Sequence, residues 1–381
     1  MTKLFLIAGE ASGDQLGGML MRAVREQEPG AAFSGVGGEQ MSRAGLDSLF
    51  PISDLAVMGL APLARLPKLI SRLNLTVATI LADPPDCLVL IDAPDFTHRV
   101  ARRVRAKAPH IPIVDYVSPS VWAWRPWRAR RMRDYIDLVL AVLPFEPDAY
   151  RRLSGPPCVY VGHPLIEALP TLQPREGERR RDNLLLVLPG SRETEVKRML
   201  PLYLEAATLL ADERPDLDIA IPVAPRMEKL IARLAAEGKV KPRFLSQNEK
   251  HAAFRTARTA LVTSGAATLE LALAQTPMIV AYKVSYAESL LKFLVTAPHF
   301  ALPNLVLERR AIPELFQNEA SPQALAGALA AIFDEGPARL RQVADLAELR
   351  KKLLVGGAKP SAHAARLVLE RAGAAKSRGK G

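Results

Sequence analysis

Residues 261–282 read LVTSGAATLELALAQTPMIVAY, a pattern that predicts a strand, a tight turn, a helix and a second strand. The turn falls at Ser264 and Gly265. A helix that begins there offers unpaired backbone N–H groups and the positive end of its dipole, which suit a diphosphate. Glu270 follows inside the helix and could hydrogen-bond the two ribose hydroxyls of a nucleotide. The alternative is an N-capped core helix with Glu270 on its solvated side.

The same alternation of short apolar strands and helix-like segments runs through the whole chain, as in parallel α/β sheets. LFLIAGEASGD (4–14) and LLLVLPGSRETE (184–195) each open one series with a strand, a glycine turn and a polar helix start. We therefore predict an α/β fold of two Rossmann-like domains, with the active site in the cleft between them. The candidate strands are 4–8, 33–36, 87–91, 112–117, 138–142 and 158–161, then 184–188, 219–223, 243–245, 259–263 and 278–282.

The expected domain boundary lies in a proline-rich segment, residues 163–183, which ends in a charged run typical of a linker. We expect an N-terminal domain at 1–170 and a nucleotide-binding domain at 180–340. Residues 341–381 form a helical segment with two open placements. It either packs back on the N-terminal domain or is exchanged between the subunits of a dimer.

Composition narrows the class of protein. The chain has 381 residues, of which 49% are hydrophobic, enough for two buried cores. Its two cysteines form no CxxC pair, so a cytoplasmic location is expected. The sequence has no uninterrupted run of 18 apolar residues, so we expect no membrane-spanning helix. A formal charge of +11 indicates an anionic partner, whether a nucleic acid, a phosphorylated substrate or a membrane surface.

The segment LPGSRETE (188–195) places Ser191 and Arg192 beyond the carboxyl end of a strand, where open α/β sheets bind ligands. Arg192 offers a bidentate fork to phosphate oxygens, which would stabilise a leaving diphosphate without a metal. The structural alternative is a surface salt bridge from Arg192 to Glu193 or Glu195.

A second ligand-end segment is LVLIDAPDF (88–96), in which Asp92 ends an apolar strand and Pro94 turns the chain before Asp95. A carboxylate at that position suits a general base that takes a proton from an attacking hydroxyl. We interpret Asp92 as the base and Asp95 as an orienting or capping group. Alternatively, both aspartates cap the following helix.

The N-terminal loop GEASGDQLGG (9–18) is rich in glycine, but its spacing is not GxGxxG. We expect it to shape an acceptor pocket through Glu10, Ser12 and Asp14. Phosphate binding by the turn is the second interpretation.

Two segments combine apolar and basic residues. YVSPSVWAWRPWRARRMR (116–133) holds all three tryptophans and five arginines, and we single out Trp122, Trp124 and Arg125. Rings interleaved with cations suit single-stranded nucleic acid or an anionic membrane interface, whereas a solvated helix is the plain alternative. MGLAPLARLPKLISRLNL (58–75) has apolar residues at helical spacing. Its basic residues Arg65, Lys68 and Arg72 share another face, as in an interfacial helix or a core-packed surface helix.

Metal chemistry is not expected. Asp216 and Asp218 match a DxD pattern, but they precede the strand at 219–223 and so fall at the wrong edge of the sheet. The six histidines show no ligand spacing. His163, in VGHPL, is either a substrate contact in the linker or a structural histidine.

Together these segments resemble the lipid A disaccharide synthase family of Gram-negative bacteria, which are glycosyltransferases of the GT-B fold. The similar runs extend from residue 8 to about residue 305 and so cover most of the chain. They are AGEASGD, LAVMG, IDAPDF, YVSPSVWAWR, DLVLAVLPFE, VGHPL, LPGSRETEV, SGAATLELALAQTPMIVAY and LPNL.

The resemblance implies transfer from UDP-2,3-diacylglucosamine to 2,3-diacylglucosamine 1-phosphate, with inversion, a β-1,6 linkage and release of UDP. It implies no metal or other cofactor, a peripheral position on the cytoplasmic face of the inner membrane, and a homodimer. By motif, Asp92 matches the essential aspartate, and Arg192, Glu270 and Asn304 match UDP-contacting positions. Where relatives often have SGTATLE, Ala266 supplies no hydroxyl, so contacts there fall to Ser264, Thr268 or the backbone.

The resemblance also implies that the N-terminal domain receives the acylated acceptor and faces the membrane, which would explain both apolar and basic segments. Two other classes are weighed against it. One is another UDP-sugar transferase or a UDP-N-acetylglucosamine 2-epimerase. The other is a nucleic-acid-binding protein that uses the Trp/Arg segment, but no RRM, KH or helix-turn-helix pattern is present, so no nucleic-acid partner is expected.

Overall fold

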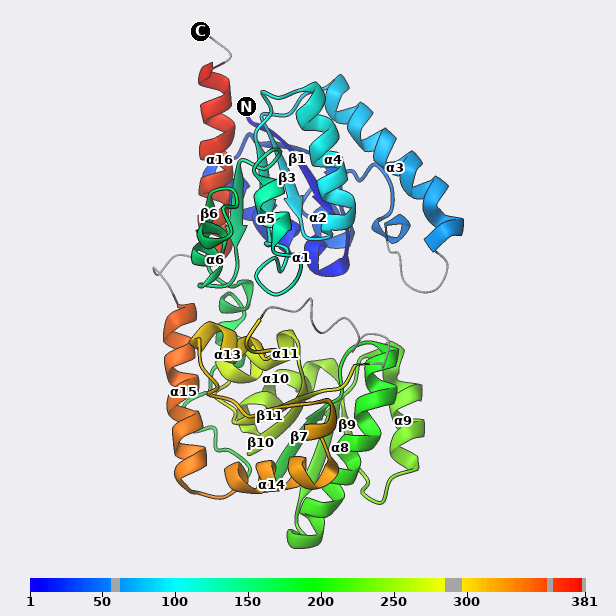
Figure 1. Ribbon diagram of the computed structural model, residues 1–381, viewed down its shortest axis with the longest axis vertical. Helices are drawn as coiled ribbons and strands as arrows, with labels where there is room; N and C mark the ends of the chain where they lie inside the picture. Colours follow the sequence, from blue (N-terminus) through cyan, green and yellow to red (C-terminus); the bar gives the residue numbers. More distant parts are fainter. Residues whose placement is uncertain (56–61, 285–296, 355–358, 379–381) are drawn as a thin grey trace. The chain divides into compact units, whose positions relative to one another are not determined.

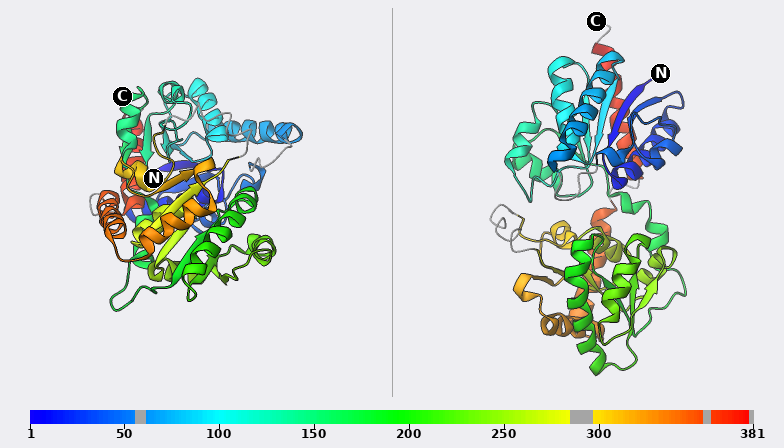
Figure 2. Two further views of the ribbon diagram at one scale, coloured as in Figure 1. Left: turned by 60° about the horizontal axis from the view of Figure 1, so that its bottom comes forward. Right: turned by 90° about the vertical axis from the view of Figure 1, so that its right-hand side faces the viewer.

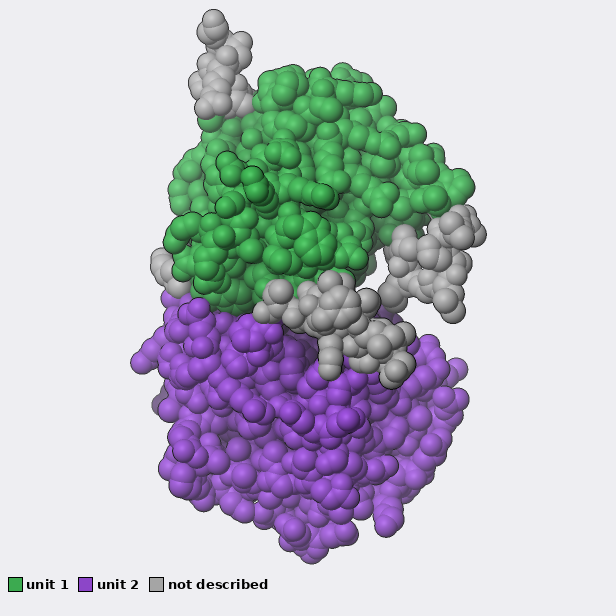
Figure 3. All heavy atoms as spheres, viewed as in Figure 1, with its two compact units in different colours: residues 1–166, 355–381 green, residues 167–354 purple. Residues whose placement is uncertain are grey.

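The computed structural model describes residues 1–381 except 56–61, 285–296, 355–358 and 379–381, and it leaves the side chains of 62–65 and 375–378 undescribed. The chain forms two compact units, coloured separately in Figure 3. Unit 1 comprises Met1–Ile166 with Val355–Gly381, and unit 2 comprises Glu167–Leu354. Among the described residues, no helix has the length and apolar character that a membrane crossing requires.

Unit 1 is a six-stranded parallel sheet in the order β2-β1-β3-β4-β5-β6, with helices on both faces (Figures 1 and 2). Its strands are β1 Lys3–Ala8, β2 Ala32–Val36, β3 Cys87–Ile91, β4 Ile113–Tyr116, β5 Leu138–Ala141 and β6 Cys158–Tyr160. Its helices are α1 Ala11–Gln27, α2 Glu39–Arg43, η1 Ile52–Asp54, α3 Pro62–Ala82, α4 Pro94–Lys107, α5 Trp127–Met132, α6 Glu146–Arg152, η2 Pro164–Ile166 and α16 Pro360–Arg378.

Strand β3 shows why these short apolar runs form a central sheet. All five of its residues are buried, and successive side chains point to opposite faces. Leu88 and Leu90 join the core under α3 and α4, whereas Val89 and Ile91 join the core under α1 and α16. Helix α16 lies against α1, so the C-terminal helix belongs to unit 1 and covers its sheet (Figure 1).

Unit 2 repeats the architecture with the order β12-β11-β10-β7-β8-β9. Its strands are β7 Leu184–Leu188, β8 Asp218–Pro222, β9 Arg243–Leu245, β10 Thr259–Thr263, β11 Met278–Tyr282 and β12 Glu314–Phe316. Its helices are α7 Leu169–Leu172, α8 Glu193–Glu213, η3 Pro225–Met227, α9 Glu228–Ala236, α10 Gln247–Thr256, α11 Ala266–Leu273, α13 Leu302–Leu307, η5 Gln317–Glu319, α14 Pro322–Phe333 and α15 Pro337–Leu353.

The strand orders locate one topological switch point in each unit. In unit 2, β7 lies between β8 and β10, so the chain winds outward in both directions from the β7/β10 pair. In unit 1, β1 lies between β2 and β3. Ligands of open α/β sheets bind at the carboxyl ends of the strands that flank such a switch point. The turns after β7 and β10, and after β1 and β3, are therefore the places to look for a site.

Candidate active site

A cavity of about 480 Å³ opens at the switch point of unit 2. Its walls come from the turns after β7 and β10, the end of β8, and helices α9, α10 and α11. The lining residues include the following polar side chains: Ser191, Arg192, Glu195, Gln247, Lys250, Thr263, Ser264 and Glu270. Four of these were predicted as donor-site residues from the sequence, and the structure brings them together.

The turn after β7 is shaped by Gly190, whose φ of 108° lies in the left-handed region. A Cβ there would meet Glu195 Oε2 at 2.6 Å, so a side chain has no room. Glu195 Oε2 accepts the backbone N–H groups of Ser191 (3.1 Å) and Arg192 (3.2 Å) at the start of α8. A carboxylate therefore already occupies the anion-binding position of this helix N-terminus.

The Arg192 side chain is 68% exposed on the cavity, and its guanidinium lies 3.4 Å from Glu195 Oε1. Glu193 pairs with Lys197 instead, at 2.5 Å. The predicted alternative, a surface salt bridge from Arg192, is thus present with Glu195. Its N–O distance is long, and most of the Arg192 guanidinium stays exposed. An exposed ion pair of this kind contributes little stability.

The turn after β10 leads into α11. Ser264 Oγ donates to the Phe300 carbonyl at 2.6 Å, and Thr268 Oγ1 donates to the Gly265 carbonyl at 2.7 Å. Both hydroxyls are therefore committed to the backbone, and α11 has no side-chain N-cap within the described part of the chain. Ala266 and Ala267, the first two residues of α11, line the cavity, so the helix start faces it.

Glu270 and Lys250 form an ion pair inside this cavity, with Lys250 Nζ 2.6 Å from Glu270 Oε2. The same oxygen is buried and has no hydrogen bond of acceptable geometry with any described residue. The pair holds the Glu270 carboxylate in the cavity wall beside a cation. No sequence motif marked Lys250, which reaches the site from α10.

Asn304 lies elsewhere, fully buried in α13. Its Nδ2 donates to Ile312 O (2.8 Å) and to Glu314, and its Oδ1 accepts the N–H groups of Ala311 (2.9 Å) and Ile312 (2.7 Å). These bonds commit the whole amide to the loop before β12. In this structure Asn304 stabilises the loop before β12 and is not among the residues that line the cavity.

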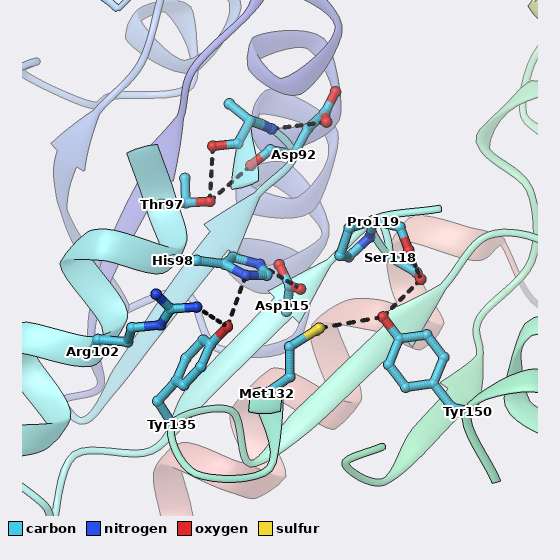
Figure 4. Close-up of polar contacts among 11 residues, drawn as sticks. Asp92, Thr97, His98, Arg102, Asp115, Ser118, Pro119, Met132, Tyr135 and Tyr150 are labelled. Atoms are coloured by element: carbon cyan, nitrogen blue, oxygen red, sulfur yellow. Dashed lines mark hydrogen bonds and ion pairs between the residues drawn. The ribbon is translucent and has the colours of Figure 1, made fainter. Parts of the chain in front are cut away.

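In unit 1, Asp92 lies at the switch point between β1 and β3, directly after Ile91 (Figure 4). Its Oδ1 accepts the Ala93 N–H at 2.8 Å, and its Oδ2 lies 3.4 Å from Ser12 Oγ. Thr97 Oγ1 donates to the Asp92 carbonyl at 3.0 Å, which ties the turn to α4. The structure thus brings Asp92 and Ser12 together, with Glu10 exposed on the turn after β1.

The Asp92 turn is strained. Asp92 and Ala93 have φ values of 55° and 48°, a conformation that is rare for residues other than glycine. A Cβ on Gly9 would lie 2.3 Å from the Ala93 Cβ, so only glycine fits the neighbouring turn. Strain of this kind concentrates at functional sites, where surrounding contacts maintain it.

Two other acidic residues have different surroundings. Asp95 is 91% exposed in the first turn of α4 and lies 3.7 Å from Arg128. Asp14 is buried, and its carboxylate accepts the N–H groups of Gly38 (2.7 Å), Gln40 (2.9 Å) and Met41 (3.0 Å) at the start of α2. Asp14 therefore caps a helix, a role that the sequence analysis did not assign to it.

Trp122 donates its indole N–H to Glu146 Oε1 at 3.1 Å and packs edge-on against Phe145. The Arg125 guanidinium stacks on the Trp124 ring, 5.2 Å from its centroid. Burial raises the pKa of Glu146 to about 7, although hydrogen bonds from the Leu143 N–H and Trp122 act in the opposite direction. Sequence reasoning missed Glu146 because its side-chain partner, Trp122, lies 24 residues away along the chain.

On α3, Lys68 and Arg72 both pair with Asp54, at 2.6 and 2.8 Å. The basic face is therefore partly neutralised, while Leu66 and Ile70 are 41% and 43% exposed. The side chain of Arg65 lies outside the described residues.

The DxD residue Asp218 begins β8 and pairs with Arg181 and Arg243, at 2.7 and 2.8 Å. In the described part of the chain, no group of three His, Cys, Asp or Glu side chains is arranged to hold a metal ion. Burial lowers the pKa of His163 to about 4, and its Nδ1 accepts the Leu165 N–H at 3.2 Å. His163 is therefore a neutral histidine that supports the turn at 163–165.

Solved structures with the same fold align over nearly the whole chain. The MnaA–UDP structure of S. aureus aligns with a TM-score of 0.63 and 15% identity, over 95% of this chain and 94% of that one. MurG of Acinetobacter baumannii aligns with a TM-score of 0.59 and 12% identity, over 97% of this chain and all of that one. The predicted α/β fold of two Rossmann-like units, as in GT-B glycosyltransferases, is confirmed.

Sequence comparison identifies the family. The family model for lipid-A-disaccharide synthetase matches residues 4–365. The lipid-A-disaccharide synthase of Rhodopseudomonas palustris (strain BisB18) is 48% identical over 96% of this chain and 95% of its own length. That of Nitrobacter winogradskyi is 47% identical over 97% and 95%. The chain belongs to the lipid-A-disaccharide synthase family of glycosyltransferases, as its motifs predicted.

Proposed function

We propose that this chain transfers 2,3-diacylglucosamine from UDP to the 6-hydroxyl of 2,3-diacylglucosamine 1-phosphate. The new bond joins the acceptor O6 to the donor C1, and the bond from C1 to the diphosphate breaks with release of UDP. A single direct displacement inverts the configuration at C1 and gives the β-1,6 linkage. Family membership supports the reaction, and the polar cavity at the unit 2 switch point is the structural observation that carries it.

In this proposal the cavity of unit 2 holds the UDP moiety. Arg192 and the N-terminus of α11 neutralise the diphosphate as negative charge develops on it. Glu270 accepts hydrogen bonds from the ribose hydroxyls, a role favoured by the position of its carboxylate in the cavity wall. The backbone at Ala266 takes the place of a hydroxyl contact there, since Ser264 and Thr268 are committed elsewhere.

Asp92 is the proposed general base that takes the proton from the acceptor hydroxyl. Its strained turn at a switch point, and the long contact of 3.4 Å between its Oδ2 and Ser12 Oγ, favour this assignment over the exposed Asp95. A base must have its carboxylate oxygens accessible to the substrate proton. The loop with Trp122, Trp124 and Arg125, together with Glu10, forms the acceptor side in this proposal.

We also propose that the protein works as a peripheral protein on the inner face of the cytoplasmic membrane, and as a homodimer. The exposed Leu66 and Ile70 on α3 and the net charge of +11 support membrane association. An interfacial position shortens the path by which acylated substrates leave the bilayer. The family resemblance alone supports the dimer.

The deciding experiment incubates the purified protein with UDP-diacylglucosamine and diacylglucosamine 1-phosphate, followed by mass spectrometry of the lipid product. We expect a disaccharide 1-phosphate and one UDP for each bond formed. A parallel incubation with UDP-N-acetylglucosamine alone tests the alternative of a UDP-N-acetylglucosamine 2-epimerase. Epimerised sugar with no disaccharide would overturn the proposal.

A further inference from the structure

The loop between β4 and α5, residues 117–126, leaves the sheet beside Asp92. The Asp92 N–H donates to the Tyr116 carbonyl at 3.1 Å, and Tyr116 is the last residue of β4. The loop then carries Trp124 and Arg125, which stack on each other. The loop therefore begins at the strand end that is hydrogen-bonded to the proposed base.

The backbone of this loop is strained near both ends. Val117 has a φ of 75° and Arg125 a φ of 54°. A β-branched residue is a genuine outlier in the left-handed region. Such a conformation persists only where the surrounding contacts over-determine it. The loop must therefore be held from outside.

Glu146, the first residue of α6, makes the central contact. It is only 2% exposed, and its Oε1 accepts the Trp122 indole N–H at 3.1 Å. Its Oε2 accepts the N–H groups of Val142 (3.1 Å) and Leu143 (2.9 Å) in the turn before α6. One carboxylate thus ties the middle of the loop to the β5–α6 turn.

A second tie lies one helical turn further along α6. Ser118 Oγ lies 2.9 Å from the Tyr150 hydroxyl, to which it donates, so the start of the loop is held by the same helix (Figure 4). Tyr150 is buried and also contacts the Met132 sulfur of α5. Helix α6 therefore fixes the loop at two points.

A buried carboxylate is a poor choice for stability alone. Within the described part of the chain, no lysine or arginine pairs with Glu146, so its charge is met only by neutral donors. Removing a carboxylate from water without a cation is unfavourable, and an apolar side chain of similar size often serves a core better. Three acceptor contacts with fixed directions are what the carboxylate supplies instead.

We propose that Glu146 is a positioning residue that holds the loop 117–126, through Trp122, in the conformation that receives the anionic sugar acceptor. This inference rests on the proposed function and adds to it a residue that does not touch substrate. Arg125, stacked on Trp124, is the cation that the held loop presents to the acceptor phosphate.

The first test compares Glu146→Gln with Asp148→Asn, an exposed carboxylate in the same helix that pairs with Arg151. A Gln side chain must direct its NH₂ group at a donor, so at least one of the three contacts is lost. We expect the acceptor KM to rise about tenfold in Glu146→Gln, with the donor KM and the UDP affinity unchanged. Asp148→Asn should match the wild type. An unchanged acceptor KM in folded Glu146→Gln would overturn the proposal.

The second test uses Trp122→Phe, which keeps a ring against Phe145 but removes the N–H that Glu146 accepts. If Trp122 acts through its hydrogen bond to Glu146, the acceptor KM of the double variant Glu146→Gln/Trp122→Phe should equal that of Glu146→Gln alone, because both changes break the same hydrogen bond. Additive effects on the acceptor KM would contradict the proposal. Where Glu146→Gln does not fold, Trp122→Phe alone must still raise the acceptor KM.

Hydrogen exchange separates this inference from the proposed function. We expect faster amide exchange across 117–126 in Glu146→Gln and no change across 184–195 in the other unit. A wild type without disaccharide product would refute the proposed reaction, while the exchange result still decides whether Glu146 holds the loop. If the wild type is active and amide exchange across 117–126 is the same in Glu146→Gln as in the wild type, the inference about Glu146 is refuted.

Discussion

Asp92 is the residue on which the proposed chemistry depends. We expect Asp92→Asn to lower kcat by about a thousandfold, because an amide takes up no proton from the acceptor hydroxyl. UDP affinity should stay unchanged, since the residues that line the proposed UDP cavity belong to unit 2. Initial rates and calorimetric titration with UDP measure the two effects. Asp95→Asn is the comparison, and a loss of turnover there with a normal Asp92→Asn would reverse the two roles.

Arg192 and Glu270 are expected to contact different parts of the donor. Arg192→Ala and Glu270→Ala should each raise the Kd of UDP by about ten- to a hundredfold, as for a lost hydrogen bond to a charged group. Uridine separates them, because only Glu270→Ala should weaken its binding. Lys197→Ala, which removes an exposed cation of α8, the helix that follows Arg192, serves as the control. Equal loss of uridine and UDP affinity in Arg192→Ala would exclude a diphosphate contact.

Glu146 gives the stability of unit 1 a pH dependence of known sign. Burial raises its pKa in the folded protein to about 7 from 4.5. Its contribution is therefore fully present below pH 4.5 and is lost as the pH rises through 7, by about 3 kcal/mol at most. Urea unfolding at pH 5 and pH 8 should show this loss in the wild type but not in Glu146→Gln. Identical pH dependence in both proteins would contradict the shift.

At the scale of elements, Asp14 belongs to a helix cap. Because its carboxylate accepts three N–H groups at the start of α2, Asp14→Ala should lower the free energy of unfolding by about 2 kcal/mol. UDP affinity should be unaffected. Urea unfolding measures the change, and Glu39→Ala, exposed in the same helix, is the control. A stable Asp14→Ala variant with a raised acceptor KM would restore the acceptor role.

The elements themselves were largely predictable from local sequence. Strands such as β3 and β10 are buried on both faces and so appear as unbroken apolar runs. The strand β12 escaped prediction, because the buried residue of Glu314–Phe316 is the charged Glu314 and no apolar run marks the strand. The turns after β1, β3, β7 and β10 carried enough glycine and polar residues to mark the ligand edge of each sheet.

Side-chain partners from distant segments were not predictable. Asp14 lies in a glycine-rich turn that suggests a ligand, but its role depends on a helix 25 residues later. Lys250 reaches Glu270 across two packed helices, and no motif marks that contact. The partners of the predicted linker were not predictable either. Its residue Arg180 donates four hydrogen bonds within unit 2, to Ala257, Ala274, Gln275 and Thr276. Its charged end is therefore bound to one unit.

At the scale of the whole molecule, one architecture is used twice with different chemistry. The unit 2 switch point opens into a cavity lined by Arg192 and Lys250, each of which lies beside a carboxylate of the same cavity. The unit 1 switch point presents Asp92, a carboxylate suited to take up a proton. Because the two sheets have related strand orders, the difference lies in the turn residues and not in the fold.

The charge of the whole chain and the apolar face of α3 lead to a test on membranes. We expect the protein to bind vesicles that contain anionic lipid, and binding should weaken between 0.1 and 1 M salt, as the Debye length falls from about 10 to about 3 Å. Replacing both Leu66 and Ile70 by Ser should lower the remaining affinity about tenfold, because their exposed apolar surface would no longer enter the interface. Leu340→Ser is the matched control, since Leu340 is an exposed leucine on α15 of unit 2. Sedimentation with vesicles measures all three, and equal binding by the double variant and the wild type would rule out α3 as the docking helix.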